Sequence, residues 1–122
     1  MIITIILVII SAISNACMDV VWNNFNSSIF FNINNKWFDP HMSWLNKWNW
    51  WPTKLGKFLL STIFVFITDF WHLCKFIMLV CYSLAIALNV NIFNNIIETF
   101  VLYCLFTCTF ELFWSKFLIK KK

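Results

Sequence analysis

Three long apolar runs dominate the chain and are separated by two polar stretches. The runs cover residues 2–22, 58–88 and 96–118, and the polar stretches cover 23–57 and 89–95. A membrane-spanning helix needs about 20 mostly apolar residues in a row, and each run reaches that length. The runs do not alternate between apolar and polar positions, as the strands of an outer-membrane barrel do. The pattern therefore predicts an all-α integral membrane protein with about three transmembrane helices.

The composition points to the same class of protein. Of the 122 residues, 61% are hydrophobic and 11% are charged, against roughly 45–50% and about 25% in globular proteins. A soluble fold of this length has too little interior to bury so much apolar surface, so a bilayer is the expected solvent. One glycine and two prolines are too few for a loop-rich or all-β protein. We expect residues 1–122 to form a single membrane domain.

The uncharged part of the first run, residues 2–18, is slightly short for a span, and continuation to Trp22 supplies the missing length. A processed leader over residues 1–17 is the alternative. Leader peptides begin with a basic region, and this chain begins without one. Ala12 and Ala16 lie four positions apart, a small-residue spacing that allows another helix to approach closely.

The second run is too long for one simple crossing. At about 1.5 Å per residue, a helix over 58–88 would extend about 46 Å, whereas the hydrocarbon core is about 30 Å thick. The helix would therefore protrude or tilt, or the crossing would begin near residue 70. A polar cluster at 69–75 lies inside the run, and a crossing that began at residue 58 would bury Asp69 about 16 Å deep. We favour a start near residue 70, which leaves the cluster at the membrane surface.

The polar stretch 36–52 contains five of the eight tryptophans, interleaved with Lys and Asn. Indole rings favour the headgroup region, where an apolar ring and a polar N–H are both satisfied. Asp39 and Pro40 suit the cap and the first position of a helix. We predict a short interfacial helix over 40–51; the alternative for this stretch is aromatic recognition of a ligand or partner. Three tryptophans share one face of such a helix: Trp44, Trp48 and Trp51.

The net charge of +4 comes from lysine alone. No basic face accompanies a soluble fold, so we expect membrane lipids and no nucleic acid as partners. The stretch 89–95 has no lysine, whereas the first polar stretch and the C-terminus share most of them. These lysines are Lys36, Lys47, Lys54 and Lys57, and then Lys116, Lys120, Lys121 and Lys122. In a three-span protein both regions lie on one side, and the positive-inside rule places that side in the cytoplasm. We therefore expect the cytoplasmic (inner) membrane, with the C-terminus cytoplasmic and the N-terminus outside.

Four motifs follow one another over residues 12–80. They are Asn15–Asp19, Ser28–Phe30, Trp37–Trp48 and Thr68–Lys75. The ordered set resembles a family of small uncharacterised integral membrane proteins of Bacteroidota and their phages. That family shows Met-Asp, Phe-Trp-Asn/Asp-Pro, Ser-Trp-x-Asn-Lys-Tyr, and Thr-Asp-x-Trp-His-Leu-x-Lys; this chain has tryptophan at the last position of the third motif. The resemblance implies a membrane protein and singles out residues, but it implies no activity.

Asp69, His72 and Lys75 are the candidate catalytic residues. Their spacing of three keeps them within an arc of about 120° on a helix, so that they can face one partner or one cavity. The structural interpretation is that the set orients the helix at the inner interface, with Lys75 reaching the headgroups. The catalytic interpretation is that Asp69 fixes the tautomer of His72, whose imidazole then acts as acid or base.

Metal binding has less support from the sequence. His72 with His41 and either Asp19 or Asp39 would supply suitable ligands, but no His-x3-His or Glu-x2-His pattern occurs on a helix. We expect no metal and no cofactor. Five polar residues shared with the family are expected to form one patch with the 69–75 cluster beneath the membrane. They are Asp19, Asp39, Ser43, Asn46 and Lys47.

The remaining thiols and carboxylates are expected to be structural. The cysteines fall in or beside apolar segments, where a thiol packs as a small hydrophobe. They are Cys17, Cys74, Cys81, Cys104 and Cys108. Glu111 lies about one helical turn from Lys116, and we expect these two to pair at the interface.

Two classes of function follow from these observations. The first is a non-enzymatic membrane protein that acts by association, as a homo-oligomer or with a membrane-protein partner in a larger complex; a phage lysis or exclusion factor would be a special case. A transporter would require oligomers, because the chain is too small to enclose a path alone. The second is a small membrane-embedded enzyme that acts on lipid or headgroup, with His72 as base and Asp69 as its orienting residue.

Overall fold

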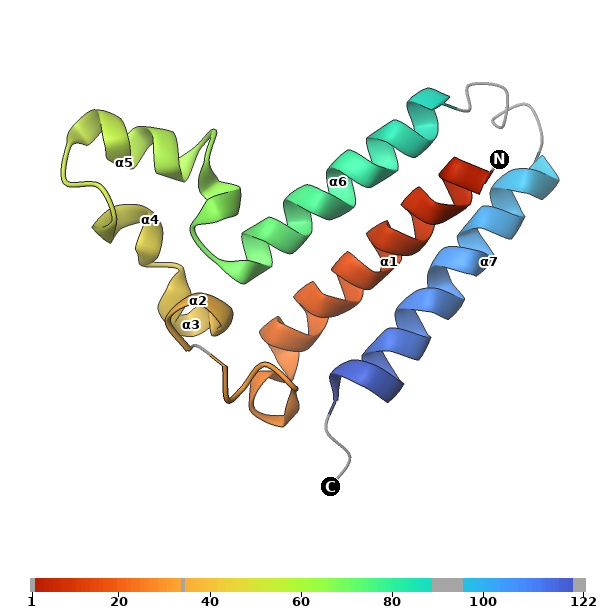
Figure 1. Cartoon of the computed structure of the whole chain (residues 1–122), viewed down its shortest axis with the longest axis horizontal. Coiled ribbons are helices and arrows are strands. Elements are labelled where there is room, and N and C mark those ends of the chain that lie inside the picture. The colour runs from red at the N-terminus through yellow and green to blue at the C-terminus, as the bar shows by residue number, and fades with distance from the viewer. Residues whose placement is uncertain (1, 34, 89–95, 120–122) are drawn as a thin grey trace.

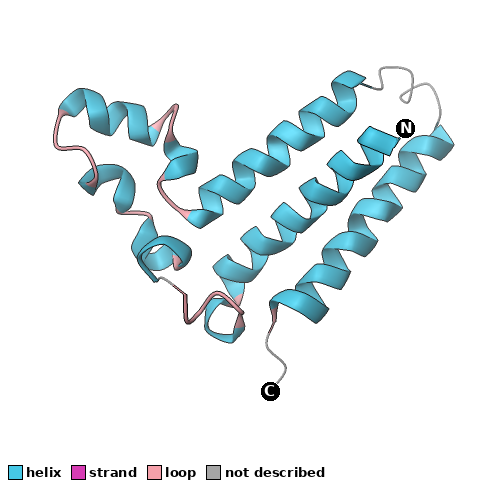
Figure 2. Ribbon diagram, viewed as in Figure 1, coloured by secondary structure: helices cyan, strands magenta, loops and turns pink. Residues whose placement is uncertain are grey.

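The computed structural model describes residues 2–33, 35–88 and 96–119. Apart from turns and one isolated bridge, these residues are helical (Figure 2). Three helices are long and apolar enough to cross a membrane. They are α1 (Ile2–Asn23), α6 (Phe70–Leu88) and α7 (Ile96–Leu112), the last of which continues as a π-helical turn, η4 (Phe113–Leu118). The prediction of an all-α integral membrane protein with three transmembrane helices is confirmed.

The three long helices lie in one layer, with α1 in the middle and α6 and α7 on its two sides (Figure 1). Helices α1 and α7 run in the same direction, and α6 runs in the opposite one. The end of α1, the start of α6 and the end of α7 therefore meet at one end of the layer. On α1, the side chains of Ser11, Ala12 and Ala16 are 0% exposed, and such small residues allow close helix approach, as the alanine spacing predicts. The Ser11 hydroxyl donates to the carbonyl oxygen of Met78 in α6 at 3.2 Å.

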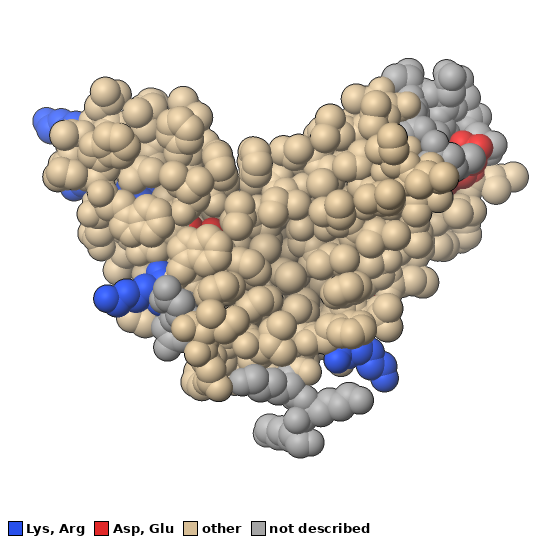
Figure 3. All heavy atoms as spheres, in the orientation of Figure 1, with Lys and Arg blue, Asp and Glu red and all other residues tan. Residues whose placement is uncertain are grey.

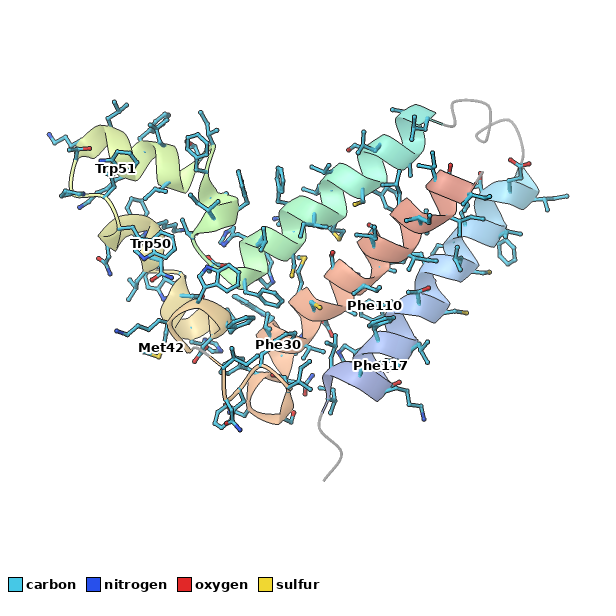
Figure 4. The ribbon with its side chains drawn as sticks, viewed as in Figure 1. Phe30, Met42, Trp50, Trp51, Phe110 and Phe117 are labelled. Carbon is cyan, nitrogen blue, oxygen red and sulfur yellow. The ribbon has the colours of Figure 1, made fainter. Side chains whose placement is uncertain are left out.

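A hydrophobic core closes the end of the layer where the three helices meet. Phe30, Phe38 and Phe70 form an aromatic cluster there, with ring centroids 4.6–5.4 Å apart. Aromatic pairs of this kind contribute about 0.5–1.5 kcal/mol each beyond the area that they bury. Figure 4 shows Phe30 beside the end of α1 and Phe110 of α7 turned toward α1. The buried members of the core are Ala16, Val20, Val21, Phe25, Phe30 and Leu118.

The segment between α1 and α6 forms several short helices, where the sequence predicts one interfacial helix over 40–51. Asp39 caps the second of them as predicted, because its Oδ1 accepts the backbone N–H of His41 at 2.9 Å. The helical stretch is interrupted at Trp44 and Leu45 and ends before Pro52, because a proline disfavours helical conformation in the residue before it. In chain order the pieces are η1 (Phe25–Ser27), α2 (Asn35–Phe38), α3 (Pro40–Ser43), α4 (Asn46–Asn49), α5 (Lys54–Ser61) and η2 (Val65–Ile67).

The tryptophans of this segment remain accessible, as an interfacial position requires. Four of them are about half exposed, with values of 49%, 42%, 51% and 52%. In the same order they are Trp44, Trp48, Trp50 and Trp51.

The apolar run 58–88 is not one helix. Helix α5 ends at Ser61, and α6 begins at Phe70. The hydroxyls of Ser61 and Thr62 both donate to the carbonyl oxygen of Phe58, at 3.0 and 2.7 Å, and local bonds of this kind compete with continuation of a helix. The helix that is long and apolar enough for the second span is therefore α6, and it begins at residue 70, where the sequence favours the start of the crossing.

Gly56 lies in the first turn of α5, directly beside Trp51. A Cβ atom at this position would come within 2.8 Å of the Cβ of Trp51 and closer still to its ring. The Gly56 N–H donates to the Oγ1 of Thr53 at 3.1 Å, which caps the helix. The absence of a side chain at Gly56 therefore leaves space for the Trp51 side chain between α4 and α5.

We expect Gly56→Ala to displace Trp51, because the new methyl overlaps the near end of that side chain, which must shift to make room. The cost is about 1–3 kcal/mol, as for other overpacked sites. Thermal unfolding in detergent and the rate of proteolysis between α4 and α5 measure it. Leu55→Ala is the control, since Leu55 is 68% exposed. If the two variants behave alike, the packing of Trp51 on α5 is wrong.

Candidate functional site

The first turn of α6 is built around Asp69. Its Oδ1 accepts the backbone N–H of His72 at 2.9 Å, which caps the helix. Its Oδ2 lies 2.6 Å from the Nδ1 of His72. The Thr68 hydroxyl lies 3.2 Å from the same Oδ2 and donates to the carbonyl oxygen of Val65 at 2.7 Å. The side chain of Asp69 is 3% exposed and that of His72 is 24% exposed, so the carboxylate is covered while the imidazole stays accessible.

The Asp69–His72 pair has the geometry of a general base and its orienting carboxylate. When neutral, His72 keeps its proton on Nδ1 because that atom faces the carboxylate, and this leaves Nε2 as an acceptor. The same contacts also stabilise the helix, because they satisfy an N–H of the first turn and a buried carboxylate. The arrangement therefore serves either the catalytic or the structural interpretation.

Lys75 does not extend this pair. Its Nζ lies over the ring of Trp71, 5.0 Å from the centroid, and the described residues show no ion pair between Lys75 and Asp69. A cation over an exposed indole gains about 0.5–1 kcal/mol. The structure thus brings two of the three predicted catalytic residues together and places the third on an aromatic ring.

The short helices between α1 and α6, residues 25–67, are called the interfacial segment below. Asn46 connects this segment to the start of α6. Its Nδ2 donates to two backbone carbonyl oxygens, that of Lys36 at 2.8 Å and that of Thr68 at 2.8 Å. One side-chain amide therefore satisfies carbonyls from two separate parts of the chain. Sequence reasoning placed Asn46 in a polar patch, and in the structure it ties α4 to the turn that carries the Asp69–His72 pair.

Asp19 lies near the end of α1, where its Oδ1 accepts from the Nδ2 of Asn23 at 2.7 Å. Both residues line an open pocket of about 220 Å³, together with Trp22 and Trp71. Asp19 is therefore close to the first turn of α6, although the structure shows no contact between its carboxylate and His72.

Trp22 is a residue that sequence reasoning used only to lengthen the first span. Its ring stacks on His41, with centroids 6.1 Å apart, and lies 6.0 Å from the ring of Trp71. Trp22 also lines a second pocket of about 540 Å³, together with Asp39 and His41. The available signal was its position three residues after Asp19, which puts both side chains on one face of α1.

The remaining residues of the predicted patch lie apart from the Asp69–His72 pair. Ser43 is 1% exposed, and its hydroxyl has no hydrogen-bond partner among the described residues. The Nζ of Lys47 lies 5.7 Å from the centroid of Trp48. His41 stacks on Trp22, so the two histidines have different partners. Within the described ranges, no three His, Cys, Asp or Glu side chains gather closely enough to hold a metal ion.

The cysteines are free thiols, and four of the five are buried or half-buried. Cys17 of α1 and Cys74 of α6 lie beside each other across the helix interface. Cys108 of α7 is exposed. Packing inside the helix layer accounts for the first group, as expected of small apolar side chains.

Comparison with protein-family models, with curated proteins and with solved structures finds no match for this chain. The resemblance to the Bacteroidota and phage membrane proteins therefore remains a prediction that rests on the motifs themselves.

Asn46→Asp is expected to loosen the interfacial segment from α6. The change preserves shape but replaces the donor with an oxygen that faces two carbonyl oxygens. Loss of these two hydrogen bonds, one exposed and one partly buried, costs about 1 kcal/mol or more. Thermal unfolding in detergent measures this loss. Asn49→Asp is the matched control, since it adds the same charge in α4 at an exposed position. Equal stability of the two variants would show that the hydrogen bonds of Asn46 do not hold the interfacial segment against α6.

Proposed function

We propose that the protein acts by association in the membrane, either with itself or as a subunit of a larger membrane complex. The observation that carries this proposal is the burial of α7. In its most apolar 18-residue stretch, 0% of the residues are buried inside the chain, compared with 39% in α1. A spanning helix that its own chain leaves uncovered has its surface available to partners.

We further propose that the protein belongs to the family that its motifs resemble and resides in the cytoplasmic membrane with its C-terminus inside. The lysines support this orientation. Figure 3 shows them over the interfacial segment and at the end of α7, while acidic atoms lie at the opposite end of the helix layer in this view. These two regions share one end of the layer, and lysine enrichment marks the cytoplasmic side.

The test of association is the mass of the protein in mild detergent. Native mass spectrometry after affinity purification should give a species heavier than the 14.6 kDa chain, as a multiple of that mass or with a second membrane protein. A protein that runs only as the single chain, across a range of mild detergents, would contradict the proposal.

A second candidate function is catalysis on a lipid or its headgroup. The observation that favours it is the 2.6 Å contact between His72 Nδ1 and Asp69 Oδ2, with the carboxylate buried and the imidazole accessible. His72 would act as the base, and Asp69 would hold the ring and stabilise its charged form.

Asp69→Asn separates the two functions. Asparagine caps a helix about as well as aspartate, so association predicts normal abundance and normal mass. Catalysis predicts instead a large loss of lipid turnover, on the order of 10⁴-fold where a buried aspartate orients a catalytic histidine. Asp69→Ala is the comparison, because loss of the cap costs about 0.5–2 kcal/mol and lowers stability under either proposal. Lipid composition of the membranes and thermal unfolding are the two measurements.

A further inference from the structure

A row of polar side chains follows α7 along its outer surface. The members are four positions apart, and each has an exposed side chain. They are Thr99, Tyr103, Thr107, Glu111 and Ser115, and we call this row the polar ridge. Residues four apart form the continuous ridges by which helices pack against one another. The hydrophobic residues Phe110, Phe113 and Trp114 instead turn toward the core of the chain, so the ridge is a separate face of α7.

The hydrogen bonds of the ridge leave acceptors facing outward. The Thr107 hydroxyl donates to the carbonyl oxygen of Tyr103 at 2.9 Å, and the Ser115 hydroxyl donates to that of Glu111 at 2.7 Å. Within the part of the chain that the structure describes, the Tyr103 hydroxyl and the Glu111 carboxylate have no hydrogen bond or ion pair. The predicted ion pair of Glu111 with Lys116 is wrong, because no such contact forms within 4.0 Å.

Hydrocarbon is a poor environment for these groups. Glu111 lies seven residues before the end of the span, about 10 Å along the helix axis. Ionisable residues at such depths usually face other helices or water, because lipid tails satisfy neither their charge nor their hydrogen bonds. The polar ridge is therefore expected to face a protein surface that supplies hydrogen bonds and charge, which lipid tails do not.

We propose that the polar ridge binds the polar ridge of a second copy of this chain. This inference rests on the proposed function of association and names its partner and its surface. All copies insert in the same orientation, so two α7 helices pair in parallel, and the hydroxyl side chains of one ridge meet those of the other at the same depth. Such an interface is isologous and closes as a dimer. Small hydroxyl residues on the ridge permit the close, right-handed crossing that rows of this spacing favour.

The charges of α7 complement each other across such a dimer. Lys116 is exposed and follows Glu111 by five residues, which is about 7.5 Å along the axis. In a parallel pair, the Lys116 ammonium group of each copy lies near the C-terminal end of the other copy's α7. From there it can reach the Glu111 carboxylate of that copy. Two symmetric ion pairs would then replace the intrachain pair that does not form.

Disulfide crosslinking of the full-length chain in membranes tests the surface. Cys104 and Cys108 are first replaced by serine, and one new cysteine is then placed at Thr107 on the ridge. The control carries its cysteine at Leu79 of α6, which is 51% exposed. With a copper–phenanthroline oxidant, Thr107→Cys should give a band of twice the chain mass and Leu79→Cys should not.

A charge exchange tests the pairing. Glu111→Lys should weaken dimerisation about tenfold or more, since it removes two ion pairs and opposes like charges. Glu111→Lys combined with Lys116→Glu should restore it. The dimer constant in detergent micelles, from fluorescence energy transfer between labelled copies, measures both variants.

The outcomes distinguish this inference from the proposed function. A heavy species in mild detergent without the Thr107→Cys crosslink would overturn the second copy as occupant of the ridge and leave association standing. A crosslink from Leu79→Cys alone would move the interface to α6 and overturn the inference as well. A single chain in detergent without any crosslink would overturn both.

Discussion

The carboxylate of Asp69 is the contact on which the second membrane crossing depends. One oxygen accepts the N–H of His72 and closes the helix N-terminus, and the other holds the imidazole. With this cap in place, α6 begins at Phe70 and runs for 19 residues. Its length of about 28 Å matches the hydrocarbon core of about 30 Å. The preceding apolar residues belong to separate short elements, and the cap lies at the end of the helix layer.

The same turn holds the interfacial segment from two sides. The carbonyl oxygen of Thr68 accepts a hydrogen bond from Asn46, while the ring of Phe70 packs against Phe30 and Phe38. A polar tie and an aromatic cluster thus act on neighbouring residues of one turn. The position of the lysine-bearing segment relative to the three long helices therefore follows from the residues that start α6.

The spans were predictable because they depend on continuous apolarity and on the thickness of a bilayer. The start of α6 followed from two independent limits, the length of 58–88 and the cost of burying Asp69. The interruption at Trp44 was not predictable in this way. It accompanies the turn in which Asn46 reaches carbonyls 10 and 22 positions away in the chain, and no local pattern reveals such contacts. The position of Lys75 was missed for a related reason: on a helix its neighbours at both three and four residues before it share its face, and Trp71 competes with His72 for it.

The small residues of α1 allow one flat layer of helices in which the outer faces of α6 and α7 are not covered by the rest of the chain. Ser11, Ala12 and Ala16 are fully buried, so the middle helix approaches its neighbours closely while α6 and α7 lie on its two sides. A layer of this kind has wide outer faces, and lipid covers their apolar parts at little cost, since no hydrophobic force drives helices together in a bilayer. Exposure of apolar side chains on α7 therefore leaves room for a partner but does not specify which partner binds. The carboxylate of Glu111 is different, because lipid tails offer it no partner, and the proposed self-association through α7 depends on this group.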